Sequence, residues 1–564
     1  MAYDNKTKAD MRLHALSDEY WNIILKHFPF TATDIGDHRF DDVLPDFSLE
    51  NREAFYSALG DLERRTAALD EAALQGQDRI TFEILQDTLH MELEGRDFVE
   101  EQWTINHLHC ALTQISELAD KQPVDSAENA EKLRRRFAAV PRMLEQLEER
   151  LDEGRATGRT APRIGPERLA AQLRRMLEIP IAESSFLPKK RPESMSEGEF
   201  AAIRERLAEE VERSVYPAIA RHAAYLESYL EAARERPGLC AMPSGTAWYR
   251  HLIKVYTGRT DEPEVIHREG LDELARIHSE MKAIAQEAIG KPDFRALAEE
   301  LNRRPDQLAR DRDELLRLTR ALLDRAWEKL PDYFSRLPKT PCEVRPIEAF
   351  REGDSPSGYY SRAPGDGSRP AYYYINTGTP EHRPLYNLEA LAFHEAIPGH
   401  HLQIALAQEL EDLPAFRRNT GQTAYIEGWA LYAERLSDEM GLYSSKFTRF
   451  GMLNYQAWRA ARLVIDTGLH AMGWSREKAI QTLLEATAHG RPEAEIEVDR
   501  YIVMPGQALA YMVGRIFIDR LRAKAEARLG SAFDIRAFHT TVLENGAVPL
   551  TILEKIVNRW LDGE

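Results

Sequence analysis

The sequence predicts a mainly α-helical protein with one small β-strand region that directly precedes a histidine-bearing helix. Stretches such as 138–153, 196–236 and 262–288 repeat apolar residues three and four positions apart between charged ones. That spacing is typical of helices with one apolar face, which pack against a shared core. A chain of 564 residues is long enough for more than one core, or for one large two-lobed body.

The overall composition and charge of the chain indicate which classes of protein it can belong to. Hydrophobic residues make up 43% and charged residues 30% of the chain, as in ordinary globular proteins. A formal charge of −19 disfavours nucleic acid, whose binding depends on clustered Lys and Arg. No stretch approaches the roughly 20 apolar residues that span a bilayer, and the N-terminus shows no export pattern. With only three cysteines, the sequence predicts a cytoplasmic protein that binds neither nucleic acid nor membrane, and it leaves the oligomeric state open.

After residue 350 the sequence no longer shows the helical spacing of apolar residues. Residues 351–370 are rich in Gly, Pro, Ser and Asp and predict a long loop. Residues 371–377, AYYYINT, are aromatic and β-branched and predict a strand. A new helix follows and runs into the sequence HEAIPGHH. In the N-terminal half, the Arg-rich run at 132–142 is interpreted as one exposed helix face.

The segment LAFHEAIPGHHLQ, residues 391–403, carries a candidate zinc site. A hydrolytic zinc site needs three protein ligands, commonly two histidines and a carboxylate, and a general base beside the metal. His394 and Glu395 begin the zinc-peptidase pattern H-E-x-x-H, but Pro398 stands where the second histidine belongs. Adjacent helical residues diverge by about 100°, so Glu395 would point beside the metal, as a general base should.

The second histidine ligand has two candidates. On an ideal helix His401 lies nearly in line with His394, whereas His400 lies about 120° away. The helix is not ideal here, because Pro398 lacks an N–H and crowds the preceding turn, and Gly399 permits an unusual backbone. A helix bulge would rotate His400 toward His394. Geometry therefore leaves both histidines open.

The third ligand should be a carboxylate on a nearby helix. The segment TAYIEGWALYAERL, residues 423–436, offers Glu427 and Glu434, which are seven positions apart and share one helix face. Gly428 allows another helix to approach closely. Metal-bound histidines also need outer acceptors for their second nitrogen, and Glu434 suits that role.

Four C-terminal motifs and one N-terminal motif together resemble the bacterial domain-of-unknown-function family numbered 885. That family is related to zinc metallopeptidases of the zincin type. The four C-terminal motifs occur in the same order as in the family, and the resemblance touches most of the chain. The motifs are FPFTATDIGDHRFDD at 28–42, HEAIPGHHLQ at 394–403, EGWALYAERL at 427–436, RLVIDTGLHAMGW at 462–474 and DRYIVMPGQALAY at 499–511.

The resemblance implies a specific ligand set and a specific architecture. The family pattern H-E-x-x-P-G-H makes His394 and His400 the paired histidines, and its E-G-W motif makes Glu427 the third ligand of a Zn²⁺ ion. The family likeness also implies a mainly helical, two-lobed body around a deep channel. We accordingly expect a helical N-terminal lobe over 1–340 and a catalytic zincin-like region over 341–564. The resemblance does not fix a substrate.

The function predicted from these residues is a zinc-dependent metallopeptidase with Glu395 as general base, and the channel that the resemblance implies would restrict it to short peptides. One alternative is a zinc-dependent hydrolase of a non-peptide amide or a modified amino acid, which would use the same chemistry. Another is a non-catalytic binding protein with a vestigial zinc site. The intact Glu395 speaks against this last alternative, because a dead site has no need of the base.

Five further residues are candidates for roles around the metal. Tyr373, in the predicted strand, would lie either on an edge strand that pairs with an extended peptide substrate or on a core strand with aromatic packing. His470 and Tyr501 could stabilise an oxyanion. Arg462 and Arg500 could bind the free C-terminal carboxylate of a substrate, because arginine suits carboxylate recognition. These arginines predict cleavage near the C-terminus of short peptides.

Overall fold

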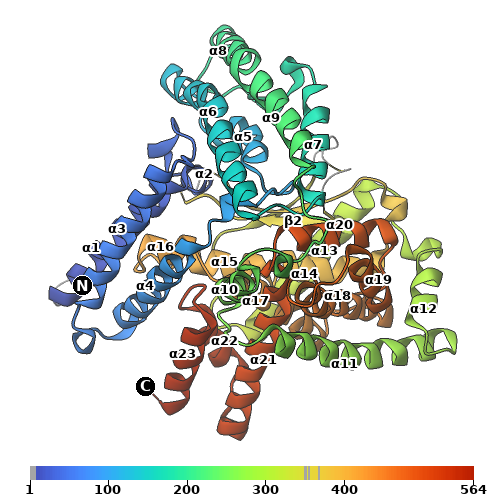
Figure 1. Ribbon diagram of the computed structural model, residues 1–564. Helices are drawn as coiled ribbons and strands as arrows, with labels where there is room; N and C mark the ends of the chain where they lie inside the picture. The colour runs from blue at the N-terminus through green and yellow to red at the C-terminus, as the bar shows by residue number, and fades with distance from the viewer. Residues whose placement is uncertain (1–7, 348–351, 353–355, 366–368, 564) are drawn as a thin grey trace. The chain divides into compact units, whose positions relative to one another are not determined.

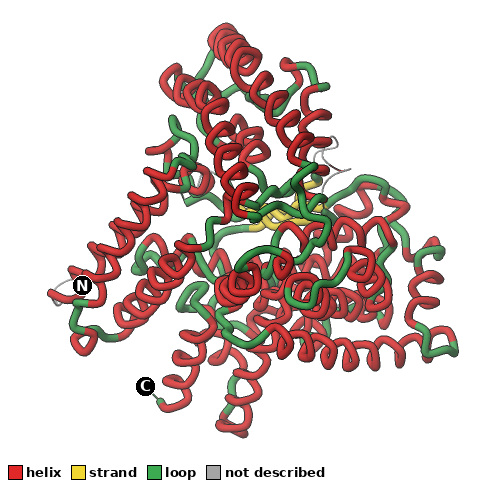
Figure 2. Tube along the Cα trace, in the orientation of Figure 1, coloured by secondary structure: helices red, strands yellow, loops and turns green. Residues whose placement is uncertain are grey.

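The computed structural model is mainly helical, with a single three-stranded sheet among the described residues, and confirms the predicted fold class (Figures 1 and 2). The structure describes residues 8–347, 352, 356–365 and 369–563. The two-lobed body around a deep channel, which we expected from the family likeness, stays a prediction.

The chain forms two compact units. The first comprises Met1–Leu74, Leu85–Trp248 and Ile502–Met504, and the second comprises Gln75–Ile84, Tyr249–Tyr501 and Pro505–Glu564. The division at residue 340 that we expected from the sequence stays a prediction.

The first unit is a helical assembly around one apolar core. Its longest helix is α6, which begins after Ser126, whose side chain accepts a hydrogen bond from the Asn129 N–H, and ends at Gly158 with a positive φ of 73°. Apolar residues of α6 to α9 interlock in the core, as the sequence period predicts. The helices are α1 Lys8–His27, α2 Pro29–Asp34, α3 Leu49–Ala67, α5 Ala111–Lys121, α6 Ala127–Thr157, α7 Ile164–Leu177, α8 Glu197–Glu210 and α9 Tyr216–Tyr229.

Arg136 corrects the interpretation of the Arg-rich run as an exposed face. Its side chain is fully buried in α6 and donates to the backbone carbonyls of Pro29, Phe40 and Val43 at 2.9–3.2 Å. It also reaches the Thr33 hydroxyl at 3.0 Å. The segment at 28–42 is therefore folded around one guanidinium, whose five donors suit several carbonyls at once.

We predict that Arg136→Met lowers the free energy of unfolding by about 3–5 kcal/mol, the usual cost of removing one partner from a buried charged network. The loss arises because several buried acceptors are left without a donor. Urea unfolding followed by circular dichroism measures it. Arg135→Met is the matched control, because Arg135 is exposed and should change stability by less than about 0.5 kcal/mol. Equal effects of the two changes would contradict a structural role for Arg136.

The second unit is built on two close helix pairs. Helix α11 (Pro263–Ile289) packs along α18 (Lys446–His470), and α17 (Thr423–Glu439) packs along α21 (Ala510–Leu529). At the second crossing a Cβ on Gly428 would lie 2.5 Å from the Gly514 backbone, so both positions must lack side chains. The other helices are α12 Phe294–Leu301, α13 Arg312–Tyr333, α14 Leu388–Glu395, α15 His400–Gln408, α16 Ala415–Asn419, α19 Arg476–Ala486, α22 Ile535–Leu543 and α23 Leu550–Asp562; α4 Gly76–Glu94, α10 Gly245–Thr257 and α20 Arg491–Val503 have residues in both units.

The sheet has the strand order β1-β3-β2, with β1 (Cys342–Pro346) parallel and β2 (Gly358–Ser361) antiparallel to β3 (Ala371–Ile375). The predicted strand is confirmed as β3. Its assignment as an edge strand is wrong, because β3 is paired on both sides. The predicted loop at 351–370 contains β2, a strand too short and too rich in neighbouring Gly and Ser to show in the sequence.

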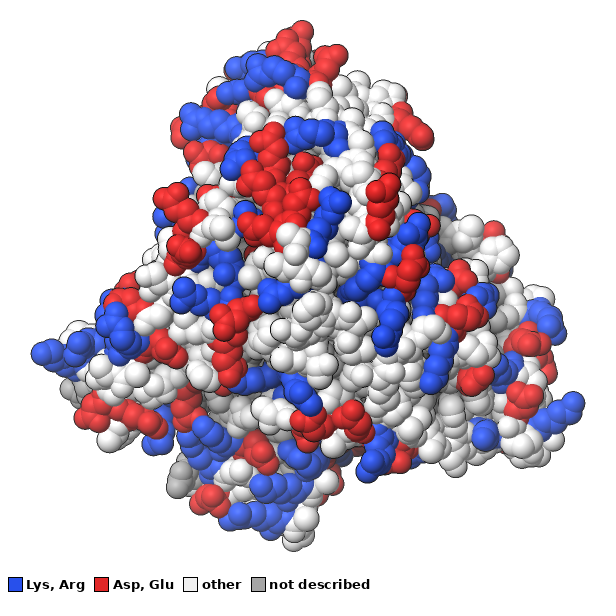
Figure 3. Space-filling view, in the orientation of Figure 1, with Lys and Arg blue, Asp and Glu red and all other residues white. Residues whose placement is uncertain are grey.

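Within the described residues, no single helix combines the length and the apolar composition that a membrane span requires. The helices Arg491–Val503 and Gln507–Ala532 meet the test only as a pair, bent by 118° between them. On the face drawn in Figure 3, basic side chains lie among acidic ones.

Candidate metal centre

The HEAIPGHH segment is two helices joined by a tight turn, and not one bulged helix. Helix α14 ends at Glu395, Ala396 leaves helical geometry at φ −108° and ψ −99°, and α15 begins at His400. A Cβ on Gly399 would lie 1.9 Å from the His394 carbonyl oxygen, so only glycine allows this turn. The indole N–H of Trp429 in α17 donates to the Pro398 carbonyl at 3.0 Å and holds the turn against α17.

The turn brings two histidines and one glutamate together. His394 Nε2 lies 3.6 Å and His400 Nε2 lies 3.4 Å from Glu427 Oε2, and the ligand atoms of all three residues lie within 4.8 Å of one another. Two ligand atoms on one tetrahedral zinc lie about 3.3 Å apart. These separations are therefore those of side chains that can share one metal ion.

Unpaired polar atoms in this cluster support the same interpretation. Glu427 Oε2 is buried and lies 3.4 and 3.6 Å from the two imidazole Nε2 atoms, but it makes no well-aligned hydrogen bond to any described residue. Leaving a buried carboxylate oxygen unpaired is costly, whereas coordinating a metal satisfies it. The donor set of two imidazoles and one carboxylate fits a hydrolytic zinc site.

Glu434 fixes the orientation of the first histidine. Its Oε1 lies 2.8 Å from His394 Nδ1, and its Oε2 accepts from the side-chain amide of Gln456 at 2.9 Å. With Nδ1 engaged, Nε2 of His394 is left to face Glu427. This is the outer-acceptor arrangement that the sequence indicated, and it orients a ligand before any metal binds.

The charges in the cluster suit a cation. Burial alone would lower the pKa of His394, but the carboxylates of Glu427 and Glu434 raise it to about 9. Burial alone would raise the pKa of Glu427, but His394 and His400 hold it well below its usual range. The negative potential that retains a proton on His394 would equally favour a metal ion.

His401 does not join the cluster. Its ring is fully buried, and its Nδ1 lies 3.2 Å from the Tyr360 hydroxyl. Burial lowers the pKa of His401 to about 4, so the ring is neutral at pH 7. The ideal-helix arithmetic that favoured His401 fails because the backbone is not helical between residues 396 and 399.

Glu395 lies beside the cluster and is held by the sheet. The Tyr360 backbone N–H donates to Glu395 Oε2 at 3.0 Å. Burial, and in part the charge of Glu427, raises the pKa of Glu395. In Figure 1, α14, which carries Glu395, lies next to the sheet and to α17. Glu395 is thus a buried carboxylate close to the cluster but outside its ligand set.

The strand that meets Glu395, β2, is one of the two edge strands of the sheet. Asn376 N–H donates to the Ser357 carbonyl at 2.9 Å, so these two residues form a hydrogen-bonded pair. Because such pairs alternate along antiparallel strands, Gly358 and Tyr360 turn their N–H and C=O groups away from β3. The sequence missed this strand, and its only visible signal was the aromatic pair Tyr359–Tyr360 within the loop pattern.

Tyr373 lies opposite Tyr360 on the central strand and is fully buried. Its hydroxyl makes no hydrogen bond within the described part of the chain. Burial and then the charge of Glu395 raise its pKa well above the usual value. Tyr373 is therefore a side chain near the general-base candidate, and not a backbone partner for substrate.

His470 and Tyr501 make hydrogen bonds to residues of α18 and α20, and not to the residues of the metal cluster. On α18, His470 follows Gln456 by 14 residues, or about 21 Å along the axis, and its Nε2 contacts the Tyr501 carbonyl at 2.9 Å. The Tyr501 hydroxyl accepts from Trp458 at 2.9 Å and from Arg462 at 3.1 Å. Neither side chain is positioned by these bonds to receive an oxyanion.

Arg462 and Arg500 share a single acid. Arg462 Nη2 lies 3.1 Å and Arg500 Nη1 lies 3.3 Å from Glu497 Oε2. Arg500 Nη2 also donates to Gln507 and Tyr511 at 2.5 and 3.4 Å. Arg500 is thus largely committed to protein partners.

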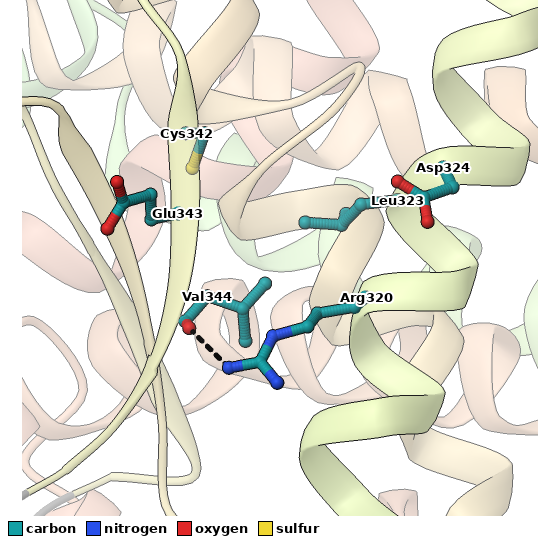
Figure 4. A pocket seen from close by; sticks show the side chains of 6 residues that line it. All are labelled: Arg320, Leu323, Asp324, Cys342, Glu343 and Val344. Atoms are coloured by element: carbon teal, nitrogen blue, oxygen red, sulfur yellow. Dashed lines mark hydrogen bonds between the residues drawn. The ribbon is translucent and has the colours of Figure 1, made fainter.

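A pocket of about 340 Å³ lies at the other edge of the sheet (Figure 4). Arg320 lines it and donates to the Val344 carbonyl at 3.3 Å. Burial raises the pKa of the Cys342 thiol, which also lines it, to about 12, so this thiol is not activated as a nucleophile. The pocket lacks the convergent ligands of the histidine cluster.

Comparison with known proteins supplies a family and a fold. The family model described as "Bacterial protein of unknown function (DUF885)" matches residues 29–557. A solved "putative lipoprotein" from Colwellia psychrerythraea is 28% identical, with a TM-score of 0.94 over 99% of this chain and 100% of that one. A "putative lipoprotein of unknown function" from Shewanella oneidensis is 18% identical, with a TM-score of 0.75 over 98% of this chain and 100% of that one.

Two further comparisons give no additional evidence about the fold or the function. A "putative oligoendopeptidase F" from Bacillus anthracis is 12% identical over 92% of this chain and 96% of that one, with a TM-score of only 0.25. No curated protein matches the chain.

The cytoplasmic location predicted from the sequence is contradicted by these findings. Both well-matched solved structures carry the description of lipoproteins, a class that is anchored to a membrane. The prediction relied on cysteine number and on the N-terminal residues, and neither reports directly on location.

Proposed function

Since the chain belongs to the bacterial family DUF885, which is described only as of unknown function, we propose a function from the site itself: a zinc-dependent hydrolase that cleaves amide bonds of short peptides. The observation that carries the proposal is the convergence of His394, His400 and Glu427, with the unpaired oxygen of Glu427 facing both imidazoles. The adjacent Glu395 adds the general base that a hydrolytic site requires.

Three protein ligands would leave a fourth metal position for water or substrate, as in catalytic zinc sites of the zincin type. A bound zinc would supply Lewis acidity, which polarises the amide carbonyl and lowers the pKa of water toward 7. Glu434 would keep His394 in the tautomer that presents Nε2.

Glu395 would move the proton. Its carboxylate takes a proton from the attacking water as the new C–O bond forms at the amide carbon. It then delivers that proton to the leaving nitrogen as the C–N bond breaks, so the carboxylate is regenerated. The Tyr360 N–H holds Glu395 in place for both transfers.

The free edge of β2 would align the substrate. Gly358 turns its N–H and C=O outward and Tyr360 turns its C=O outward beside Glu395, while the Tyr360 N–H stays bonded to Glu395. An extended peptide can pair with the remaining outward groups. This assigns to β2 the pairing role that the sequence gave to the strand of Tyr373. The unpartnered hydroxyl of Tyr373 is then available to donate to a substrate carbonyl oxygen.

Metal analysis combined with a peptide-library screen tests the proposal. We expect about one zinc per chain, cleavage of short peptides, loss of cleavage after chelation and recovery on adding zinc. Non-peptide amides in the same screen separate the alternative substrate class. A protein that holds no metal, or that cleaves equally well after complete removal of metal, would overturn the proposal.

A further inference from the structure

Two buried arginines on α18 have N–H groups without partners. Arg459 is 5% exposed and Arg462 is 2% exposed. Among the residues that the structure describes, Arg459 Nε and Arg462 Nη1 meet no hydrogen-bond acceptor. Arg459 Nη1 donates to the Tyr455 carbonyl at 3.4 Å. Buried guanidinium N–H groups are normally paired, so these two indicate a missing acceptor.

Around Arg459 and Arg462, positively charged side chains also outnumber the carboxylates within contact distance. Glu497 is the single carboxylate that Arg462 and Arg500 contact within 4 Å in the described chain, and Arg459 forms no ion pair there. Arg462 and Arg500 therefore share one contacting acid, and Arg459 has no carboxylate within 4 Å in the described chain, although Glu493 also lies in this neighbourhood. Burying cations without counter-charge is costly, and a bound anion would remove that cost.

Aromatic side chains hold the two guanidinium groups in place. The Cζ atoms of Arg459 and Arg462 each lie 4.5 Å from the Trp458 ring centroid, Arg459 also lies 4.7 Å from Tyr455, and Arg462 lies 4.3 Å from Tyr511. Stacking of this kind fixes the guanidinium plane and leaves its N–H edge free for a planar acceptor. A carboxylate is the planar anion that matches that edge.

Helix α18 also links Arg459 and Arg462 to the surroundings of the metal cluster. Gln456 of α18 contacts Glu434, the outer partner of His394. Arg459 and Arg462 follow at about 4.5 and 9 Å along the axis, and an extended peptide advances about 3.3 Å per residue. Along the helix axis the two arginines therefore lie about one to three extended-peptide residues beyond Gln456, on the helix that contacts the outer partner of His394.

We propose that Arg459, with the free edge of Arg462, forms a subsite for a substrate carboxylate one to three residues from the bond that is cleaved. The proposal rests on the peptide hydrolase function proposed above. The carboxylate is either the free C-terminus or an Asp or Glu side chain. Arg459, and not Arg500, is then the specificity-determining arginine.

Kinetics on matched peptides tests the subsite. A peptide that the enzyme cleaves is compared with its C-terminal amide, and an Asp-containing version is compared with its Asn counterpart. We expect roughly 10- to 150-fold higher kcat/KM for the acid of one pair, the fold-change of a hydrogen bond between charged groups. The pair that responds identifies the source of the carboxylate. Arg459→Gln should reduce that preference to about threefold or less, whereas Arg459→Lys should retain part of it.

The matched control is Arg449→Gln, on the same helix but paired with Asp438 and Glu280. It should leave the acid-to-amide ratio unchanged. Equal rates on acid and neutral peptides in both pairs for the unmodified enzyme would overturn the subsite and leave the hydrolase proposal standing.

Calorimetric binding separates the two proposals when no hydrolysis occurs. The Glu395→Gln protein is titrated with acetyl-trialanine as the free acid and as the amide, and with acetyl-Ala-Asp-Ala amide beside its Asn version. Tighter binding of one acid that disappears in the Arg459→Gln background supports the subsite even if no peptide is cleaved. Equal binding of acid and neutral ligands in both pairs overturns it.

Discussion

Replacing Glu395 by glutamine should leave the zinc content unchanged and slow peptide hydrolysis by roughly two to four orders of magnitude. Glutamine keeps the shape of the side chain and can still accept the Tyr360 N–H through its carbonyl oxygen. It cannot take a proton from water, so the loss should fall on kcat. Metal analysis and steady-state kinetics on one cleaved peptide measure the two effects separately.

The control for Glu395→Gln is the same change at Glu411, an exposed residue beyond the end of α15. That variant should turn over normally. Near-normal kcat in the Glu395→Gln protein would remove Glu395 from proton transfer. Loss of zinc in that protein would instead make Glu395 a ligand or a support for one.

The helices and the two candidate carboxylates could be predicted from local spacing in the sequence, whereas the choice of His400 and Glu427 as ligands followed from the family resemblance. Apolar periodicity marked helices such as α6 and α11 directly. Glu427 and Glu434 lie seven residues apart on α17 and so share a face, which makes one a ligand candidate and the other the partner of His394. Spacing along a regular helix translates into geometry without knowledge of the rest of the chain.

Features set by contacts distant in sequence could not be predicted in this way. The turn at 396–399 depends on the carbonyl of Pro398 meeting Trp429, 31 residues away. Strand β2 has four residues and exists because β3 offers it a partner. The sequence predicts Arg136 to be a surface residue, but in the folded chain the carbonyls of Pro29, Phe40 and Val43 surround it. In each case the deciding partner lies far along the chain.

A pair of histidine substitutions gives the strongest test of the metal centre. His400→Ala should abolish stable zinc binding, because it removes one of only two imidazoles in the cluster. His401→Ala should keep about one zinc per chain, because His401 contacts Tyr360 and not Glu427. Glu434→Ala should lie between them, with the roughly 10- to 100-fold loss of affinity that follows removal of an outer partner.

Zinc affinity measured by competition with a chelator ranks the three variants, and thermal unfolding shows that each remains folded. Thermal unfolding matters most for His401→Ala, because His401 is fully buried and its truncation leaves a cavity. A destabilised but zinc-loaded His401→Ala protein beside a folded, zinc-free His400→Ala protein is the expected pattern. The reverse pattern would move the ligand to His401 and would require the chain at 396–399 to be helical, contrary to its geometry at Ala396.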